Sequence, residues 1–223
     1  MSGSASEAPR LTAAQFHRAP GVADWRVTAT GTEAVFVASS LPAAAELVPA
    51  ILEAADQFDV LPDIDLRPEA IIVRIPSSPA TDIPAATPDF AAAVSLAAAE
   101  LELRADPSRV QAVDIYIAQH SAVDARPFFL AALGYEPVDD GDAVDPLRRG
   151  PQLAFNALTG DTPGRGRTHF DVFVPADQAQ ARVDAALAAG GRLVDDSSAP
   201  AWWSLASPDN HGVDIASWID TYE

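Results

Sequence analysis

The stretch from Arg165 to Trp218 reads RGRTHFDVFVPADQAQARVDAALAAGGRLVDDSSAPAWWSLASPDNHGVDIASW, and it decides the fold of the second half of the chain. It begins with a strand-like run, continues as an amphipathic helix that stops at two glycines, and ends in three more strand-like runs. Residues 109–158 have the same order: a strand, a helix that ends at Gly134, and strands again. This internal repeat of about 50 residues predicts two structural modules of one kind.

The composition excludes several functions. The chain has 223 residues and a net charge of −18, a surface that repels phosphate backbones, so we expect no binding to nucleic acid or to anionic membranes. All 14 basic residues are Arg, and the absence of Lys excludes a Schiff-base lysine. The absence of Cys excludes thiol nucleophiles, thiolate metal sites and disulfides.

Residues 1–10 and the apolar runs of the sequence predict where the protein is located in the cell. Residues 1–10 lack the basic start and apolar centre of a signal peptide, and we expect them to form a flexible leader. No apolar run approaches the roughly 18 to 20 residues that cross a bilayer. We therefore expect a soluble, cytoplasmic protein.

Residues 11–103 alternate between helical and strand-like patterns in the order α-β-β-α-β-β-α. This order predicts an α+β domain with an antiparallel sheet and helices on one face. Thr12 is the expected N-cap of the first helix. Pro42 is expected to open a helix that continues to Phe58, with a kink at Pro49. Residues 104–108 are expected to form a linker to a second domain at 109–223.

The motif PDIDLR at residues 62–67, with Trp25 before it, resembles the pterin-4a-carbinolamine dehydratase family over residues 11–103. That family carries a histidine pair before the Pro-Asp and a third histidine in a later loop. Val60 and Leu61 stand at the first positions here, and Ser77 or Ser78 at the last. Since these side chains cannot exchange protons as imidazole does, we expect a catalytically inactive scaffold that self-associates through its helices.

Residues 109–223 resemble the vicinal oxygen chelate superfamily of glyoxalase, bleomycin-resistance and dioxygenase proteins. The resemblance rests on the doubled strand-helix-strands pattern and on two motifs, PFFLAALGYEP at 127–137 and SPDNHGVDIASW at 207–218. It implies paired βαβββ modules that form an open cup.

The resemblance also implies a metal site built from the first and last strands of each module. The first-strand positions are Asp114 and His169, and the last-strand positions are Gln152 and Asp214. Three oxygen donors and one imidazole suit a divalent ion such as Mn, Fe, Ni or Mg. The alternative is a polar cup that has lost its metal but kept these residues. Asp171, two residues after His169, could replace or orient that histidine.

Four residues are candidates for binding a ligand, each with a structural alternative: Arg149, Phe155, Asp171 and Trp203. Arg149 could instead neutralise local acidic groups, and Phe155 could belong to the core. Trp202 and Trp203 are consecutive, so in a strand one of them packs under a helix while the other faces the cup or an interface.

The sequence thus predicts a small-molecule-binding or catalytic cup fused to an inactive dehydratase-like scaffold, in a homo-oligomer. One alternative is a metal-dependent lyase, isomerase or dioxygenase that uses the four predicted ligands. The other is a metal-free protein that sequesters a drug or metabolite. Since the resembled superfamily supports many reactions, its fold alone predicts none of them.

Overall fold

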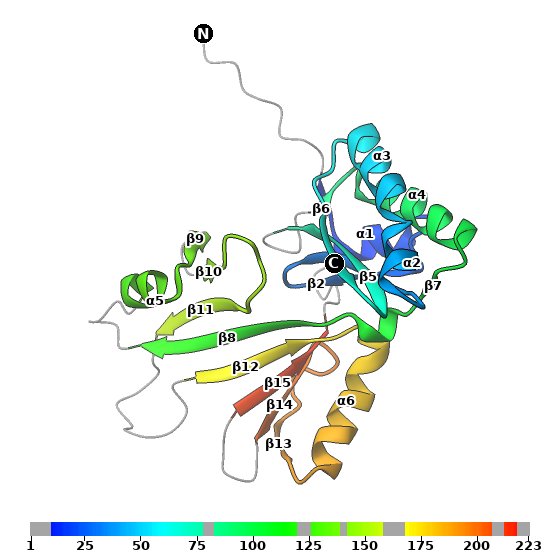
Figure 1. The fold of residues 1–223 in the computed structure, drawn as a ribbon. Coiled ribbons are helices and arrows are strands. Elements are labelled where there is room, and N and C mark those ends of the chain that lie inside the picture. Colours follow the sequence, from blue (N-terminus) through cyan, green and yellow to red (C-terminus); the bar gives the residue numbers. More distant parts are fainter. Residues whose placement is uncertain are drawn as a thin grey trace. The chain divides into compact units, whose positions relative to one another are not determined.

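The computed structural model describes residues 10–77, 83–119, 126–138, 142–157, 168–206 and 212–217. It divides into two compact units, one up to Val110 and one from Gln111 to Trp218, which are described separately (Figure 1). Both combine helices with sheets, as the α+β prediction requires. Among the described helices, none is long and apolar enough to cross a membrane.

The first unit contains a small antiparallel sheet in the strand order β2-β3-β5-β4. Figure 1 shows its helices gathered on one side of this sheet. The elements are β1 (Arg10–Leu11), α1 (Ala13–Arg18), β2 (Trp25–Thr28), β3 (Gly31–Val37), α2 (Leu41–Ala45), α3 (Val48–Phe58), β4 (Asp63–Arg67), β5 (Ala70–Pro76), β6 (Ile83–Pro84), α4 (Thr87–Glu100), β7 (Arg104–Ala105) and the 3-10 helix η1 (Pro107–Arg109). The predicted order α-β-β-α-β-β-α is present, with a further short pair between β1 and β6.

Aromatic side chains join this sheet to α4. Trp25 on β2 is fully buried and meets Phe36 on β3 and Phe90 on α4 edge to face, with ring centroids 6.4 and 6.0 Å away. Its indole N–H donates to the carbonyl of Ala91 at 3.1 Å, so the buried polar atom is paired. The helices cover this face of the sheet because the alternating strands direct their apolar side chains toward it.

Two local predictions for the first unit need correction. The helix from Pro42 to Phe58 is interrupted rather than kinked, because Pro49 falls in the first turn of a new helix, where its missing N–H costs nothing. The segment 104–108 is not a free linker. Arg104 and Ala105 pair with β3, and the Asp106 N–H donates to the Val35 carbonyl at 2.8 Å.

The second unit contains the repeat. Its two runs share the order strand, helix and three strands: β8 (Ala112–Gln119), α5 (Arg126–Leu133), β9 (Glu136–Val138), β10 (Asp142–Val144) and β11 (Gln152–Ala157), then β12 (Thr168–Phe173), α6 (Ala176–Ala188), β13 (Arg192–Asp195), β14 (Trp202–Ala206) and β15 (Gly212–Ala216). The glycines end the helices as expected, since Gly134 and Gly190 have φ of 68° and 97°.

The strands of both runs form one open sheet in the order β13-β14-β15-β12-β8-β11-β10-β9. The first strands of the two runs, β8 and β12, pair antiparallel at its centre. Each is flanked by the last strand of its own run, and these pairs, β8 with β11 and β12 with β15, are parallel. The residues that the sequence predicts as ligands therefore lie on four neighbouring central strands.

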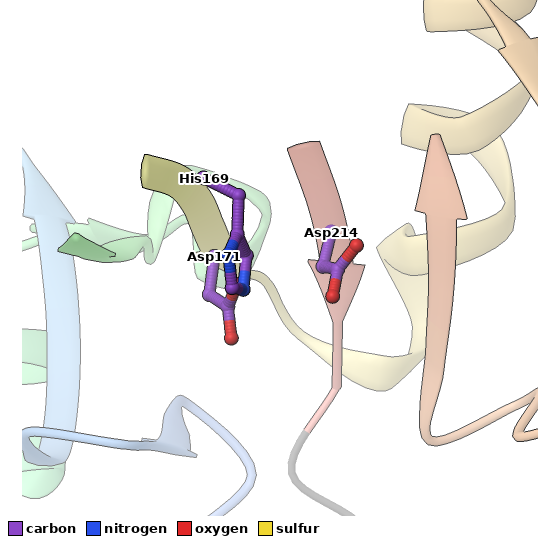
Figure 2. Close-up of side chains that lie close together, drawn as sticks. All are labelled: His169, Asp171 and Asp214. Carbon is purple, nitrogen blue, oxygen red and sulfur yellow. The ribbon is translucent and has the colours of Figure 1, made fainter. Parts of the chain in front are cut away.

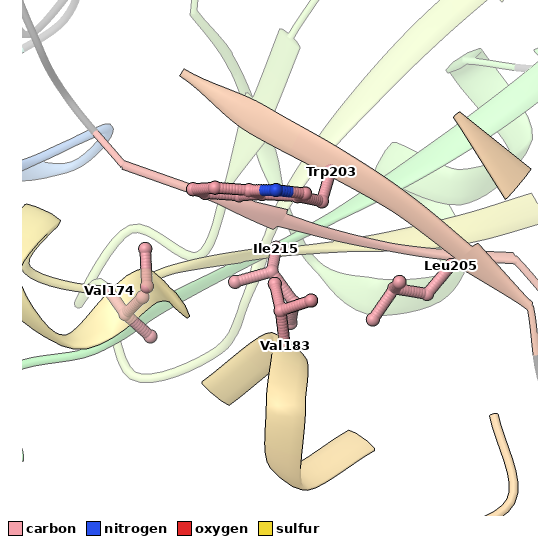
Figure 3. Close-up of a cluster of buried hydrophobic side chains, with 6 residues drawn as sticks. Val174, Val183, Trp203, Leu205 and Ile215 are labelled. Atoms are coloured by element: carbon pink, nitrogen blue, oxygen red, sulfur yellow. The ribbon is translucent and has the colours of Figure 1, made fainter. Parts of the chain in front are cut away.

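One face of this sheet is apolar and covered by the helices. Beneath α6, Trp203 and Leu205 of β14 and Ile215 of β15 pack against Val183, as Figure 3 shows. At the other end of the sheet, a second buried cluster includes Ile117 and Leu153, with partly buried Phe129 of α5 against it. Because side chains alternate along a strand, the residues between these apolar positions lie on the opposite face.

Candidate metal centre

A row of polar side chains crosses the face of the central strands that lies opposite the apolar, helix-covered face. Asp171 on β12 is the register partner of both Asp114 on β8 and Asp214 on β15, and Gln152 on β11 is the partner of Asp114. Register partners project from the same face with Cβ atoms about 5 Å apart. The row Gln152, Asp114, Asp171 and Asp214 thus places carboxylates next to one another.

Three side chains of this face converge on one point. His169, Asp171 and Asp214 each offer a ligand atom within 4.8 Å of the other two (Figure 2). The His169 Nε2 lies 3.2 Å from the Asp171 Oδ1, although this oxygen has no aligned hydrogen-bond donor among the described residues. Tyr116 stacks on the imidazole, with ring centroids 5.0 Å apart and planes at 20°. The tyrosine ring therefore restricts the orientation of His169.

The carboxylates of the row are poorly solvated and repel one another. Burial, with the neighbouring Asp171 and Asp142, raises the pKa of Asp114 to about 7. Burial and Asp214 raise the pKa of Asp171 to about 6, against the opposing effect of His169. Burial and the surrounding carboxylates also raise the pKa of Tyr116 to about 12. A bound cation would relieve this repulsion, and without one, protons are taken up near neutral pH.

The donor set fits a divalent cation. One imidazole and two carboxylates form the mixed nitrogen and oxygen set that hard-to-borderline divalent ions accept, with water completing the coordination. Asp114 and Asp171 each keep one buried oxygen without a hydrogen-bond donor among the described residues. Buried charged acceptors of this kind need a partner. The group of His169, Asp171 and Asp214 could therefore hold a metal ion.

The predicted ligands are only partly brought together. His169 and Asp214 belong to the converging group, and Asp171, predicted as a ligand-binding residue, is its third member. Asp114 lies beside Asp171 but outside the group. Gln152 uses its amide to donate to the Asp142 Oδ2 at 2.7 Å. The spacing of His169 and Asp171, two residues apart on one strand, was the signal that favoured Asp171.

The two equivalences inferred from the repeat cannot both hold. If Gln152 corresponds to Asp214, then their parallel partners correspond too, which matches Asp114 with Asp171. If Asp114 corresponds to His169, then Gln152 matches Gly212 instead. The two alternatives differ by two residues, a shift that keeps every side chain on the same face. Alternation therefore could not separate them in the sequence.

Three of the predicted ligand-binding residues make contacts within the protein that match their structural alternatives. Trp203 and Phe155 lie on the helix-covered face, where both pack into apolar clusters. Arg149 binds Asp145, with its Nε 3.0 Å from the Asp145 Oδ2. On the face of the carboxylate row the aromatic residue of β14 is Trp202, which is 46% exposed. Alternation predicted that the two tryptophans face opposite ways, but not which one faces the helix.

Comparisons with known proteins assign one family to the second unit. The glyoxalase-like domain family matches residues 114–216, so the C-terminal region contains a glyoxalase-like domain. A glyoxalase/bleomycin resistance protein/dioxygenase superfamily member from Vibrio splendidus 12B01 is similar, at 15% identity and a TM-score of 0.32, over 49% of this chain and all of its own. An NAD-dependent benzaldehyde dehydrogenase from Legionella pneumophila has 14% identity and a TM-score of 0.35, with the same coverage. Among curated proteins, none matches the chain.

Gly212 leaves room for the imidazole of the site. It is the register partner of His169, and a Cβ at Gly212 would lie 3.1 Å from the His169 Cβ. We expect Gly212→Ala to displace His169 by a few tenths of an ångström and to weaken binding of a divalent cation about 10-fold. Calorimetric titration with Mn²⁺ measures this. If the variant keeps the Mn²⁺ affinity of the wild type and the melting temperature of the metal-free protein, then the space left by Gly212 does not determine the position of His169.

Proposed function

We propose that the C-terminal domain binds or transforms a small molecule at a divalent cation held by His169, Asp171 and Asp214. The observation that carries the proposal is the convergence of these three side chains on the polar face of an open sheet. The sequence match to a glyoxalase-like domain supports it. If the domain is catalytic, we propose that its reaction is that of a metal-dependent lyase, isomerase or dioxygenase.

Each residue of the site has a distinct task in this proposal. Tyr116 stacks on His169 and keeps its imidazole directed toward the carboxylates. Asp171 occupies the centre of the carboxylate row, with Asp114 and Asp214 as its register partners on either side. The bound ion would supply a positive charge that polarises oxygen atoms of the ligand. The buried position of Asp114, which is 3% exposed, keeps water from that end of the row.

Elemental analysis of protein purified without chelator tests this function directly. We expect about one divalent ion per chain, with Mn, Fe, Ni or Mg as the candidates for this donor set. The same analysis of His169→Ala is expected to find the ion lost, because an imidazole and two carboxylates bind as one set. A wild-type protein that neither contains nor takes up a divalent ion would refute the metal-dependent function.

The second candidate function is a metal-free binding domain for a drug or metabolite. The raised pKa values of Asp114 and Asp171, about 7 and about 6, favour it specifically, because protons can then replace the metal near neutral pH. In that case the polar face of the sheet would bind a ligand through hydrogen bonds from protonated carboxyls. Metal uptake at pH 8, where both groups are ionised, separates the two functions.

For the N-terminal unit we propose a dehydratase-like fold without dehydratase activity. The order α-β-β-α-β-β-α around an antiparallel sheet supports the resemblance. Val60 is buried and Leu61 is 87% exposed at the positions where the resembled family has histidines. Of the predicted loop positions, Ser77 directly follows β5, and Ser78 lies outside the described residues. An assay with a carbinolamine pterin tests this proposal: turnover well above the spontaneous rate would contradict it.

We also propose that the protein is a cytoplasmic homo-oligomer with a small-molecule ligand and without affinity for nucleic acid or membranes. The charge of −18 supports the exclusion of polyanionic partners. The expected self-association would involve the helices of the N-terminal unit. Light scattering coupled to size exclusion measures it, and a mass of 23.3 kDa at micromolar concentration would correspond to a monomer and contradict the proposal.

A further inference from the structure

Asp114 belongs to the carboxylate row but not to the group that could hold a metal. It is 3% exposed, and its Oδ1 has no hydrogen-bond donor within the described part of the chain. A buried charged oxygen is destabilising unless a donor or a cation reaches it. Since the register directs Asp114 to the same face as Asp171, the missing partner is expected at the site itself.

Among the described residues, the neighbours of Asp114 do not supply that partner. On one side lies the carboxylate of Asp171, and on the other lies Gln152, which directs an amide N–H to Asp142 and none to the Asp114 Oδ1. The chain contains no Lys, and the ion pairs of the described residues bring no Arg to Asp114, Asp171 or Asp214. A divalent cation at His169, Asp171 and Asp214 would balance two carboxylates. Wherever Asp114 is ionised, its charge would remain.

We propose that Asp114 binds a cationic nitrogen, an ammonium or amidinium group, of the small molecule that this site accepts. The inference rests on the proposed small-molecule function of the same face. A protonated amine brings both the positive charge and the N–H donors that the buried oxygen needs, and charge-assisted hydrogen bonds of this kind are the strong ones. An anionic ligand would face three neighbouring carboxylates, and a neutral ligand would leave the charge of Asp114 unbalanced.

An ammonium group fits this position better than a second metal ion. Asp114 does not meet two further His, Asp or Glu ligand atoms within 4.8 Å among the described residues, whereas His169, Asp171 and Asp214 do meet each other. An N–H donor needs only one carboxylate oxygen that lacks a hydrogen bond, as the Asp114 Oδ1 does among the described residues. The ligand class that follows is a small amine with oxygen atoms near enough to reach the divalent ion.

Nuclear magnetic resonance of ¹⁵N-labelled protein tests this inference with simple probes. The full chain, saturated with Mg²⁺, is titrated with benzylammonium chloride, with benzyl alcohol as the uncharged analogue, and with potassium chloride as the ionic-strength control. We expect saturable shifts of the amides on β8 and β12 with benzylammonium alone. In Asp114→Asn the dissociation constant of the probe is expected to rise at least about 10-fold.

Each other outcome is decisive. Equal binding of benzyl alcohol, the absence of saturable shifts, or undiminished binding by Asp114→Asn overturns the ammonium site. A second Mg²⁺ that binds the wild type but not Asp114→Asn assigns Asp114 to a metal instead, and also overturns it. Should Mg²⁺ fail to bind while benzylammonium binding still depends on Asp114, the proposed metal function fails and the ammonium site stands. Asp114→Ser provides a second variant if the spectrum of Asp114→Asn lacks the dispersion of a folded protein.

Discussion

Asp171→Asn is expected to weaken the binding of Mn²⁺ by the C-terminal domain about 100-fold or more. The change keeps the size of the side chain but removes the charge at the centre of the row, where both register neighbours are carboxylates. An amide also offers a weaker oxygen donor to a hard cation than a carboxylate does. Calorimetric titration measures the affinity directly.

The same variant should change the stability of the protein in opposite directions with and without metal. Without metal, removing one of several repelling carboxylates whose pKa is raised is expected to stabilise the domain at pH 8. With Mn²⁺ at 100 times its wild-type dissociation constant, the wild type gains about 2.7 kcal/mol, and the variant is expected to lose most of this gain. A melting temperature that still rises with Mn²⁺ as in the wild type would contradict the assignment of Asp171 as a ligand.

Asp184→Asn is the matched control for this experiment. It removes the same charge from an exposed position on α6, the helix that covers the other face of the sheet. Asp184 accepts a hydrogen bond from Gln180 at 2.9 Å, and its loss affects only the helix surface. We expect wild-type Mn²⁺ affinity in this control. A loss equal to that of Asp171→Asn would mean that overall charge, not the site, governs the binding.

The strand alternation in the sequence predicted which residues share a face, and this is why much of the site could be found before the structure. Asp114 and Asp214, each between apolar neighbours, were expected on the polar face, and the register places them in one row. Alternation has a period of two, so it cannot fix the register between strands. For this reason Asp171, and not Asp114 or Gln152, completes the group with His169 and Asp214.

What the sequence could not predict depends on contacts between distant segments. Trp202 and Trp203 have the same side chain and opposite directions, and only the position of α6 decides that Trp203 is the buried one. Arg104 and Ala105 have the composition of a linker, but the end of β3 that extends beyond its pairing with β2 provides a partner for them. Both cases reflect tertiary partners that local patterns do not contain.

A buried glutamate in the N-terminal unit gives the second large expected effect. Glu33 on β3 is 8% exposed, with Arg26 and Arg74 as its register partners on β2 and β5. Burial raises its pKa from 4.5 to about 7, although Arg74 opposes the shift, and Asp65 adds to it. Arg74 also forms an ion pair with Asp63, whose Oδ2 lies 3.4 Å from the Arg74 Nη2, and this weakens the attraction between Arg74 and Glu33. At neutral pH and above, the ionised Glu33 therefore destabilises the unit.

Glu33→Gln is expected to stabilise the N-terminal unit by about 2 kcal/mol at pH 8 and to have little effect at pH 4.5. In the wild type, the folded state holds a proton on Glu33 that the unfolded state releases above pH 4.5, so the free energy of unfolding falls as the pH rises toward 7. The variant keeps the neutral shape of the protonated acid at every pH. Hydrogen exchange of the β3 and β5 amides, compared between variant and wild type at each pH, measures the difference.

Glu53→Gln, at an exposed position on α3, is the matched control and should show no such difference. A stabilisation of Glu33→Gln that is the same at pH 4.5 and pH 8 would mean that the gain comes from packing and not from the charge of Glu33.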